Sequence, residues 1–281
     1  MTELIFQLAA PHPASSLFFA HRTARRDQRT PLRALYTLHK KWREAAVYSD
    51  QHQAVTTLNW WHHELEKIKT DEVTHPALIA LKPWLNSNHN DHEAFFTTLQ
   101  GLLHGHMHWH HITRIEDLTQ LEPTIDAISG SFAQVWLSIT GTSQLHDHAL
   151  AAGRALWWID QIRHIGHALT PSRLWLPMSW LKELNLPAHL ILKKNLTPTQ
   201  RAEHGAGLTT LLIHHAQAAV QNYERSHQNL APAHAKASKS LHALLKMRTS
   251  LLDEMMQQPN DVWQGLVSVS PRKKWWIATW A

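Results

Sequence analysis

Apolar residues recur at helical spacing along most of the chain. Leu35, Leu38, Trp42 and Ala45 mark the first stripe, and Pro31 suits a helix start, so a first helix is predicted over about residues 31 to 48. Clusters of proline and asparagine separate most of the later apolar stripes. Further helices are predicted at about 92 to 111, 120 to 140, 146 to 168, 199 to 227 and 234 to 257.

A second amphipathic stretch runs from Leu58 to Ile68 with the sequence LNWWHHELEKI. Its apolar residues predict one buried helix face, and Glu64 and Lys67 are predicted to face outward. Pro76 is predicted to end the helix that contains this stretch.

These elements predict an all-α protein. Only 9 glycines and 13 prolines interrupt 281 residues, which favours long helices with short connections over a sheet. No composition shift, long polar linker or internal repeat divides the chain. Residues 1–281 are therefore expected to form a single domain with one large core.

Composition narrows the functional classes. The absence of cysteine excludes disulfides, iron-sulfur clusters and thiolate zinc sites. The first residues lack the basic start and long apolar core of a signal peptide, and no stretch reaches the roughly 18 to 20 apolar residues of a membrane span. A soluble, cytoplasmic protein is expected, and peripheral contact with a membrane stays open.

The charge favours negatively charged partners. The formal net charge is +5 with 25 histidines not counted, so the molecule becomes more positive as pH falls through about 6.5. The basic residues are scattered, and no zinc-finger, RNA-recognition or helix-turn-helix pattern is present. No nucleic-acid partner is expected.

The segment from Ala149 to His167 carries two different helical stripes. One stripe is apolar and suits a core: Ala152, Ala155, Leu156, Ile159 and Ile162. The other is polar: Asp160, Arg163, His164 and His167. This polar stripe either lines a cavity or is a solvated face with ordinary charge pairs, and spacing alone leaves both interpretations open.

Around this segment the text ALWWIDQIRHIGHALTPSRLWLP resembles the second signature of squalene and phytoene synthases. Upstream, ALYTLHKKWREAAV at residues 34–47 resembles the first signature, and NWWHHEL at 59–65 resembles the WWRxEL that follows it. SSLFFAHR at 15–22, Gly130-Ser131 and the stretches 247–255 and 261–275 also resemble the family, in the same order. The residues shared with the second signature are Leu156, Ile162, Arg163, Gly166, Arg173, Leu176 and Pro177.

The resemblance implies an isoprenoid-synthase-like bundle of antiparallel helices around a central cavity. In active relatives, aspartates on two facing helices hold the magnesium ions that grip prenyl diphosphates, since magnesium prefers hard oxygen ligands. The positions that match those aspartates are Arg43, Val47, His164 and Ala168. The chain thus resembles a divergent member that lacks both aspartate-rich motifs, and no magnesium cofactor is expected.

The same substitutions suggest how a ligand could be held. Arg43, Arg163 and Arg173 remain where acidic residues are lost, and arginine binds phosphate through a bidentate fork without a metal. Alternatively, these arginines pair with Glu44, Asp160 or other carboxylates. The candidate substrate-binding residues are Tyr36, Arg43, Glu44, Asp160, Arg163, His164, His167 and Arg173.

Histidine and tryptophan are unusually frequent. In HGHMHWHH at 104–111, a helix would place His104, His108 and His111 on one face. These three imidazoles either bind zinc or nickel, or their spacing arises by chance in a histidine-rich chain. The paired tryptophans line a prenyl cavity or, as the better interpretation, fill helix contacts: Trp60, Trp61, Trp157, Trp158, Trp275 and Trp276. The ending RKKWWIATWA combines cations with aromatics and could touch a membrane surface.

The leading functional hypothesis is a non-catalytic homologue that binds an isoprenoid, a lipid phosphate or a protein partner. The alternative is an active prenyl transferase for head-to-head condensation, with altered ligands or as one subunit of a pair. His164 or His167 would then be its general acid. A histidine-based transition-metal binder is a minor alternative.

Overall fold

The computed structural model describes residues 8–48, 50–86, 92–168, 174–193 and 196–281. Its long helices are α3 (Arg26–Ala46), α4 (Gln51–Glu66), α6 (His92–His111), α9 (His146–Ala168), α12 (Pro198–Gln228) and α14 (Lys239–Gln257). The shorter ones are α2 (Ser16–Thr23), α5 (Pro76–Asn86), α7 (Leu118–Ile125), α8 (Ser131–Thr140), α10 (Met178–Glu183), α11 (Ala188–Leu192), α13 (Pro232–Ala237), α15 (Pro259–Val262) and α16 (Pro271–Trp280). The all-α prediction is confirmed.

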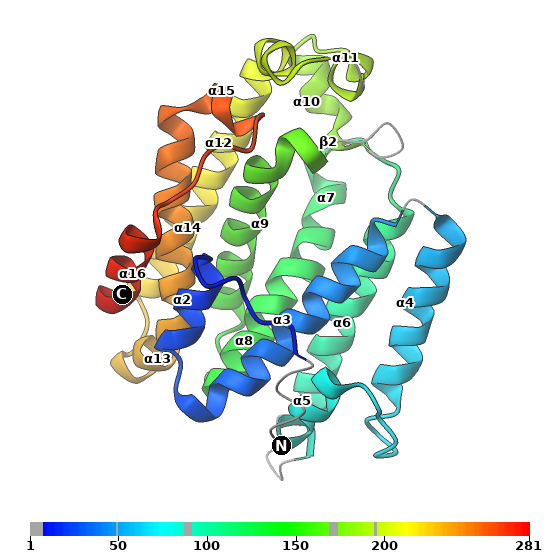
Figure 1. Cartoon of the computed structure of the whole chain (residues 1–281), viewed down its shortest axis with the longest axis vertical. Helices are drawn as coiled ribbons and strands as arrows, with labels where there is room; N and C mark the ends of the chain where they lie inside the picture. Colours follow the sequence, from blue (N-terminus) through cyan, green and yellow to red (C-terminus); the bar gives the residue numbers. More distant parts are fainter. Residues whose placement is uncertain (1–7, 49, 87–91, 169–173, 194–195) are drawn as a thin grey trace.

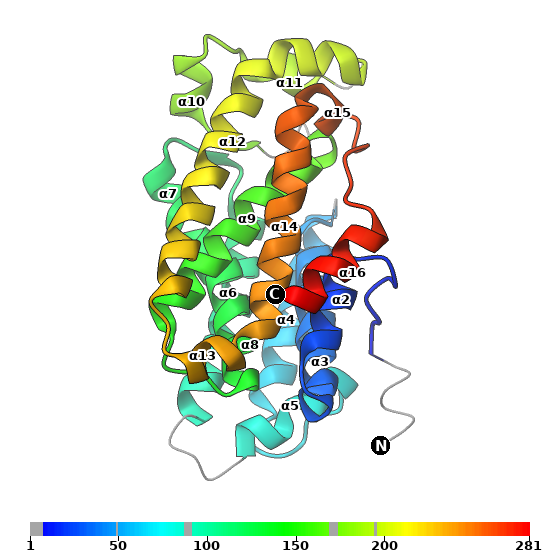
Figure 2. The ribbon, with the colours of Figure 1, turned by 90° about the vertical axis from the view of Figure 1, so that its left-hand side faces the viewer.

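The helices form an elongated bundle with α9 near its centre (Figure 1). α9 packs against α8, α12 and α14, and α3 packs against α4, α5, α6 and α8. Figure 2 shows α14 alongside α12, with α16 and α2 on its other side. In the part of the chain that the structure describes, the only strands are β1 (Arg114–Ile115) and β2 (Leu174–Pro177), which pair in parallel.

The predicted inner faces are buried. Leu35 and Leu38 of α3 and Ile159 and Ile162 of α9 have no exposed surface. Trp136 of α8 is also buried, and its indole N–H donates to Ser240 Oγ of α14 at 2.8 Å. Such buried aliphatic and aromatic contacts are the main source of stability in a helix bundle.

The helix boundaries differ from the predictions at several positions. α9 has the predicted bounds, but α3 begins at Arg26, so Pro31 lies inside the helix and does not start it. The Gln28 side chain accepts a hydrogen bond from the Arg25 N–H at 3.2 Å, which satisfies a donor at the earlier start. The predicted helix at 120 to 140 is interrupted by the π-helical turn η1 (Asp126–Gly130).

This π-helical turn lies directly against α9. A Cβ added at Gly153 of α9 would lie 2.4 Å from the Ser129 carbonyl oxygen and the Gly130 nitrogen. Only glycine allows the two backbones to approach this closely. The Gly130-Ser131 pair, noted in the sequence, therefore lies at a close helix contact.

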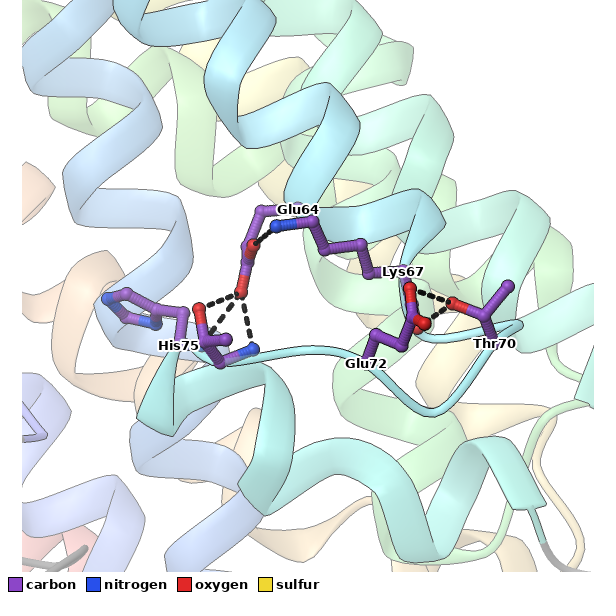
Figure 3. A network of polar contacts seen from close by, with 6 residues as sticks. Glu64, Lys67, Thr70, Glu72 and His75 are labelled. Atoms are coloured by element: carbon purple, nitrogen blue, oxygen red, sulfur yellow. Dashed lines mark hydrogen bonds and ion pairs between the residues drawn. The ribbon is translucent and has the colours of Figure 1, made fainter.

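Glu64 is buried, so the prediction that it faces outward is wrong. It has 1% exposed surface, and its Oε1 accepts from the Thr74 N–H at 2.6 Å, the Thr74 hydroxyl at 2.7 Å and the His75 N–H at 2.8 Å. Its Oε2 accepts from Lys67 Nζ at 3.0 Å (Figure 3). The carboxylate thus fixes the turn that enters α5, because a buried charge is stable only when its acceptors are filled.

Pro76 also has a different role from the one predicted. It begins α5, and α4 ends at Glu66, well before it. Proline suits the first position of a helix because its missing N–H would have no partner there in any case. Glu64 supports this start through the two N–H groups that precede the proline.

Glu64→Gln should lower the free energy of unfolding at neutral pH by about 2 kcal/mol or more. Burial opposes ionisation of Glu64, yet hydrogen bonds from Thr74, Lys67 and His75 lower its pKa to about 2. Its stabilising effect is therefore full above the unfolded pKa near 4.5 and is lost as pH falls from there toward about 2. Urea unfolding at pH 7 and at about pH 4 should show a smaller cost of the substitution at the lower pH.

Glu72→Gln is the matched control, since Glu72 is exposed and belongs to the same turn (Figure 3). It should change the free energy of unfolding by less than about 0.5 kcal/mol. An equal loss in both variants would contradict a structural role specific to Glu64.

Several histidines are buried as neutral side chains. His39 of α3 and His106 of α6 approach at 3.2 Å between Nδ1 and Nε2, beside the Phe132 ring. Burial, then the charges of His106 and Arg43, hold the pKa of His39 well below its usual value. Burial, then Arg43, lowers the pKa of His106 to about 3. These imidazoles therefore stay uncharged at neutral pH.

The protein should lose stability as pH falls from about 7.5 to 5.5. A histidine whose folded-state pKa lies below the unfolded value near 6.5 binds fewer protons when folded. Its stabilising effect is full above pH 6.5 and declines as pH falls toward the folded pKa. The double variant His39→Leu/His106→Leu should show a shallower decline in denaturant unfolding, whereas the exposed pair His52→Gln/His108→Gln should leave the slope unchanged.

Candidate functional site

The first wall of the candidate site is the carboxyl-terminal half of α3. Tyr36 and Arg43 are two turns apart and lie on one helix face, with His39 between them. Tyr36 is half-buried and Arg43 is exposed. The charge of Arg43 affects the pKa values of His39 and of His164 on α9. Arg43 and His164, two of the positions that match aspartates in the two signatures, therefore lie near each other.

The second wall is the polar stripe of α9. Asp160 and Arg163 are partly buried, and His164 keeps an exposed edge. The side chain of His167 and the whole of Arg173 lie outside the described residues. Of the eight candidate residues, the structure thus brings Arg43 together with Asp160, Arg163 and His164.

Two basic residues that the sequence did not single out complete the site. Arg248 of α14 is largely buried, and its Nη1 lies 3.0 Å from Asp160 Oδ1. Lys274 of α16 donates from Nζ to the Ala14 carbonyl at 2.9 Å. Both lie in stretches that resemble the family, 247–255 and 261–275, but their contact with α9 depends on how distant helices pack. Arg43, Asp160, Arg163, His164, Arg248 and Lys274 are called the basic cluster below.

The pKa shifts show that these charges lie close together. Burial, then Arg248, lowers the pKa of Arg163, and Asp160 opposes this shift. Burial, then Arg163 and Arg248, lowers the pKa of Lys274. Partial burial lowers the pKa of His164; Asp160 opposes this shift, and Arg163, Arg43 and Arg248 add to it. Like charges disfavour one another's charged forms, so the basic cluster is a region of concentrated positive charge.

Asp160 neutralises only part of this charge. Asp160 pairs with Arg248, and Glu44 lies 3.8 Å from Lys40 Nζ and 3.9 Å from Lys41 Nζ on its own helix. Among the described residues, no ion pair joins Arg43 or Arg163 to an acidic side chain. The alternative in which these two arginines pair with Glu44 or Asp160 is therefore not what the structure shows. In addition, Arg248 Nε is buried without a hydrogen-bond partner among these residues.

The position of α9 in the site is fixed by Trp263. A Cβ added at Gly166 would lie 2.2 Å from the Trp263 carbonyl oxygen, and one added at Gly205 of α12 would lie 2.2 Å from the Trp263 ring. The indole N–H of Trp263 donates to Thr209 Oγ1 at 2.9 Å. Trp263 thus wedges between α9 and α12 and holds the end of α9 that carries the charged stripe.

The interior beside the cluster is filled by aromatic side chains. The Trp109 and Trp157 rings meet edge to face at 5.3 Å, and Trp42 meets Trp61 in the same way at 6.0 Å. Among the described residues, two open hollows lie elsewhere, one beside Gln28, Trp84 and Phe95 and the other along α9 and α12 beside Trp158. Neither is the central cavity expected between α3 and α9.

The paired tryptophans divide between core and surface. Trp61, Trp157 and Trp158 fill helix contacts, as the better interpretation held. Trp60, Trp275 and Trp276 are exposed, so they neither line a prenyl cavity nor fill a core contact.

The histidines at 104 to 111 divide in the way that helical spacing predicts. His104, His108 and His111 are exposed, whereas His106 and His110 are buried. His104 contacts His62 of α4, with 3.4 Å between Nε2 and Nδ1. Within the described part of the chain, no three histidine or carboxylate side chains are placed to share a metal ion.

Comparisons with known proteins agree with this geometry. The family model for squalene/phytoene synthase matches residues 10–273. A search of curated proteins finds no match. A dehydrosqualene synthase crystallised with a ligand is similar in structure, with a TM-score of 0.72 and 14% identity, over 94% of this chain and 89% of that chain.

Two further solved structures share the fold. The squalene synthase HpnC from Alicyclobacillus acidocaldarius has a TM-score of 0.64 and 15% identity, over 89% of each chain. YisP from Bacillus subtilis subsp. subtilis strain 168 has a TM-score of 0.59 and 12% identity, over 94% of this chain and 89% of that chain. At such identities the likeness establishes the isoprenoid-synthase fold, and the family model covers nearly the whole chain. The chain therefore belongs to the squalene/phytoene synthase family, as a divergent member with Arg43, Val47, His164 and Ala168 in place of the aspartates of both motifs.

Proposed function

We propose that this family member binds the phosphate group of an isoprenoid or another lipid directly through the basic cluster, without magnesium and without catalysing condensation. The observation that carries the proposal is that Arg248 lies 3.0 Å from Asp160 and close to Arg163 and Lys274, while Arg43 lies near the adjoining His164. Guanidinium groups bind phosphate oxygens by charge-assisted hydrogen bonds. An anion here would also relieve the repulsion among the cations.

Magnesium does not fit the donor set of this site. The ion needs several hard oxygen ligands in near-octahedral geometry. Asp160 is the only carboxylate of the basic cluster, and Arg248 already lies 3.0 Å from its Oδ1. Arginine and lysine offer no lone pair at neutral pH, and imidazole is a poor partner for a hard ion. The cations themselves take the place of a metal as the positive charge.

The buried Arg248 gives further support. It is held by α14 next to Asp160, and its Nε has no hydrogen-bond partner among the described residues. A buried donor without an acceptor costs free energy unless a ligand or water fills it. A phosphate oxygen would satisfy this donor and the neighbouring Arg163 together.

A second candidate is a scaffold that binds a protein partner. The observation that favours it is the aromatic packing of the interior, where Trp42, Trp109 and Trp157 are buried and contact other tryptophan rings. In this case the fold would act through its surface.

Calorimetric titration with farnesyl diphosphate should show equal affinity with magnesium and with a chelator. Because the positive charge comes from side chains, magnesium should change neither affinity nor melting temperature beyond a salt effect. Arg163→Ala should weaken binding by about tenfold or more, about 1.4 kcal/mol. The control Arg225→Ala removes an exposed arginine of α12 that hydrogen-bonds to Asn222, and it should leave affinity unchanged.

Other results would decide between the alternatives. If magnesium tightened binding by about tenfold, a metal clamp would be present and the proposal would be wrong. Formation of a condensed product from farnesyl diphosphate would support the active prenyl transferase. If inorganic pyrophosphate bound about as well as farnesyl diphosphate, the ligand would be held by its phosphate alone. If neither compound bound, the scaffold for a protein partner would be the remaining candidate function.

A further inference from the structure

Helix α16 exposes its aromatic side chains to solvent. Trp275, Trp276 and Trp280 are exposed to 54%, 58% and 72%, and the rings of Trp276 and Trp280 contact each other at 5.7 Å. The buried position of this helix is the small residue Ala278. A helix at a protein surface normally turns its polar side outward, so α16 has the reverse arrangement. Exposed aromatic patches of this kind mark interaction sites.

The helix is attached firmly to the body of the protein. It packs against α14 and α2, as Figure 2 shows. Lys273 Nζ lies 2.8 Å from Glu254 Oε1 of α14, and Lys274 Nζ donates to the Ala14 carbonyl. The Ser270 hydroxyl accepts from the Lys273 N–H at 3.3 Å and caps the amino-terminal end. The three indoles are therefore held in place on the outside.

The charge around these indoles is positive. From Val262 to Ala281 the sequence has Arg272, Lys273 and Lys274 and no acidic residue. Arg272 is exposed about one helical turn before Trp275 and Trp276, and it has no ion pair among the described residues. The neighbouring α2 adds the exposed Arg22. A negatively charged partner would match this surface.

We propose that the exposed face of α16, defined by Arg272, Trp275, Trp276 and Trp280, docks on the surface of an anionic lipid bilayer. Tryptophan rings prefer the interface between lipid and water, and adjacent cations are attracted to anionic headgroups. Arg272 has no ion pair among the described residues, so its charge is available to an anionic headgroup. No helix of the described residues is long and apolar enough to cross a membrane, so the contact is peripheral.

Sedimentation with phospholipid vesicles tests this proposal. The full-length protein should bind vesicles that contain phosphatidylglycerol and should bind pure phosphatidylcholine at least about tenfold less, and high salt should weaken the binding. Trp276→Ala/Trp280→Ala should reduce the partition coefficient by about tenfold or more. Arg272→Gln should reduce binding to the anionic vesicles only.

Trp60→Ala is the matched control, because Trp60 is an indole exposed to 46% on α4, at the opposite side of the bundle (Figure 1). It should bind vesicles like the wild type, and circular dichroism should show that all variants are folded. Absence of vesicle binding by the wild type, or equal losses for the Trp60 and α16 variants, would overturn the proposal. A dimer in light scattering that Trp276→Ala/Trp280→Ala dissociates would instead assign this face to a second copy of the chain.

Discussion

The close approach of α9 to its neighbours is the constraint on which the candidate site depends. At Gly153 the helix lies against the backbone of the π-helical turn, and at Gly166 it lies against the carbonyl group of Trp263. Any side chain at these two positions would overlap backbone atoms, which cannot move aside as the end of a flexible side chain can. These contacts fix the rotation of α9 about its axis and its position along that axis. They thereby fix where the side chains of Asp160, Arg163 and His164 point.

Because α9 is fixed, the fold brings positive charges together at the place where family members with intact motifs carry aspartates. The cost of this arrangement is limited in two ways. Asp160 of the α9 stripe pairs with Arg248, and Arg43 and His164 keep contact with solvent. A bound anion would reduce the remaining repulsion, and this is the physical basis of the phosphate binding that we propose.

Two buried polar groups away from the site are held by specific hydrogen-bond partners. The Glu64 carboxylate accepts hydrogen bonds from four donors of Lys67, Thr74 and His75. Tyr223 meets His242 at 2.8 Å between the hydroxyl and Nδ1, and burial lowers the pKa of His242 to about 3. The WWxxEL sequence shared with the family thus contains a carboxylate with a structural task. His39, His106 and His242 are likewise kept uncharged at neutral pH by burial.

The sequence by itself determined the helices, the family and the missing aspartates. Helical periodicity is a local property, so the bounds of α9 and the burial of Leu35, Leu38, Ile159 and Ile162 followed from spacing. Tertiary structure decided which charges meet. Arg248 and Lys274 are about 90 and 110 positions after Asp160 and approach α9 only because α14 and α16 pack there. The burial of Glu64 was likewise undetermined by sequence, because it depends on how the turn after α4 folds back to place Thr74 and His75 against the carboxylate.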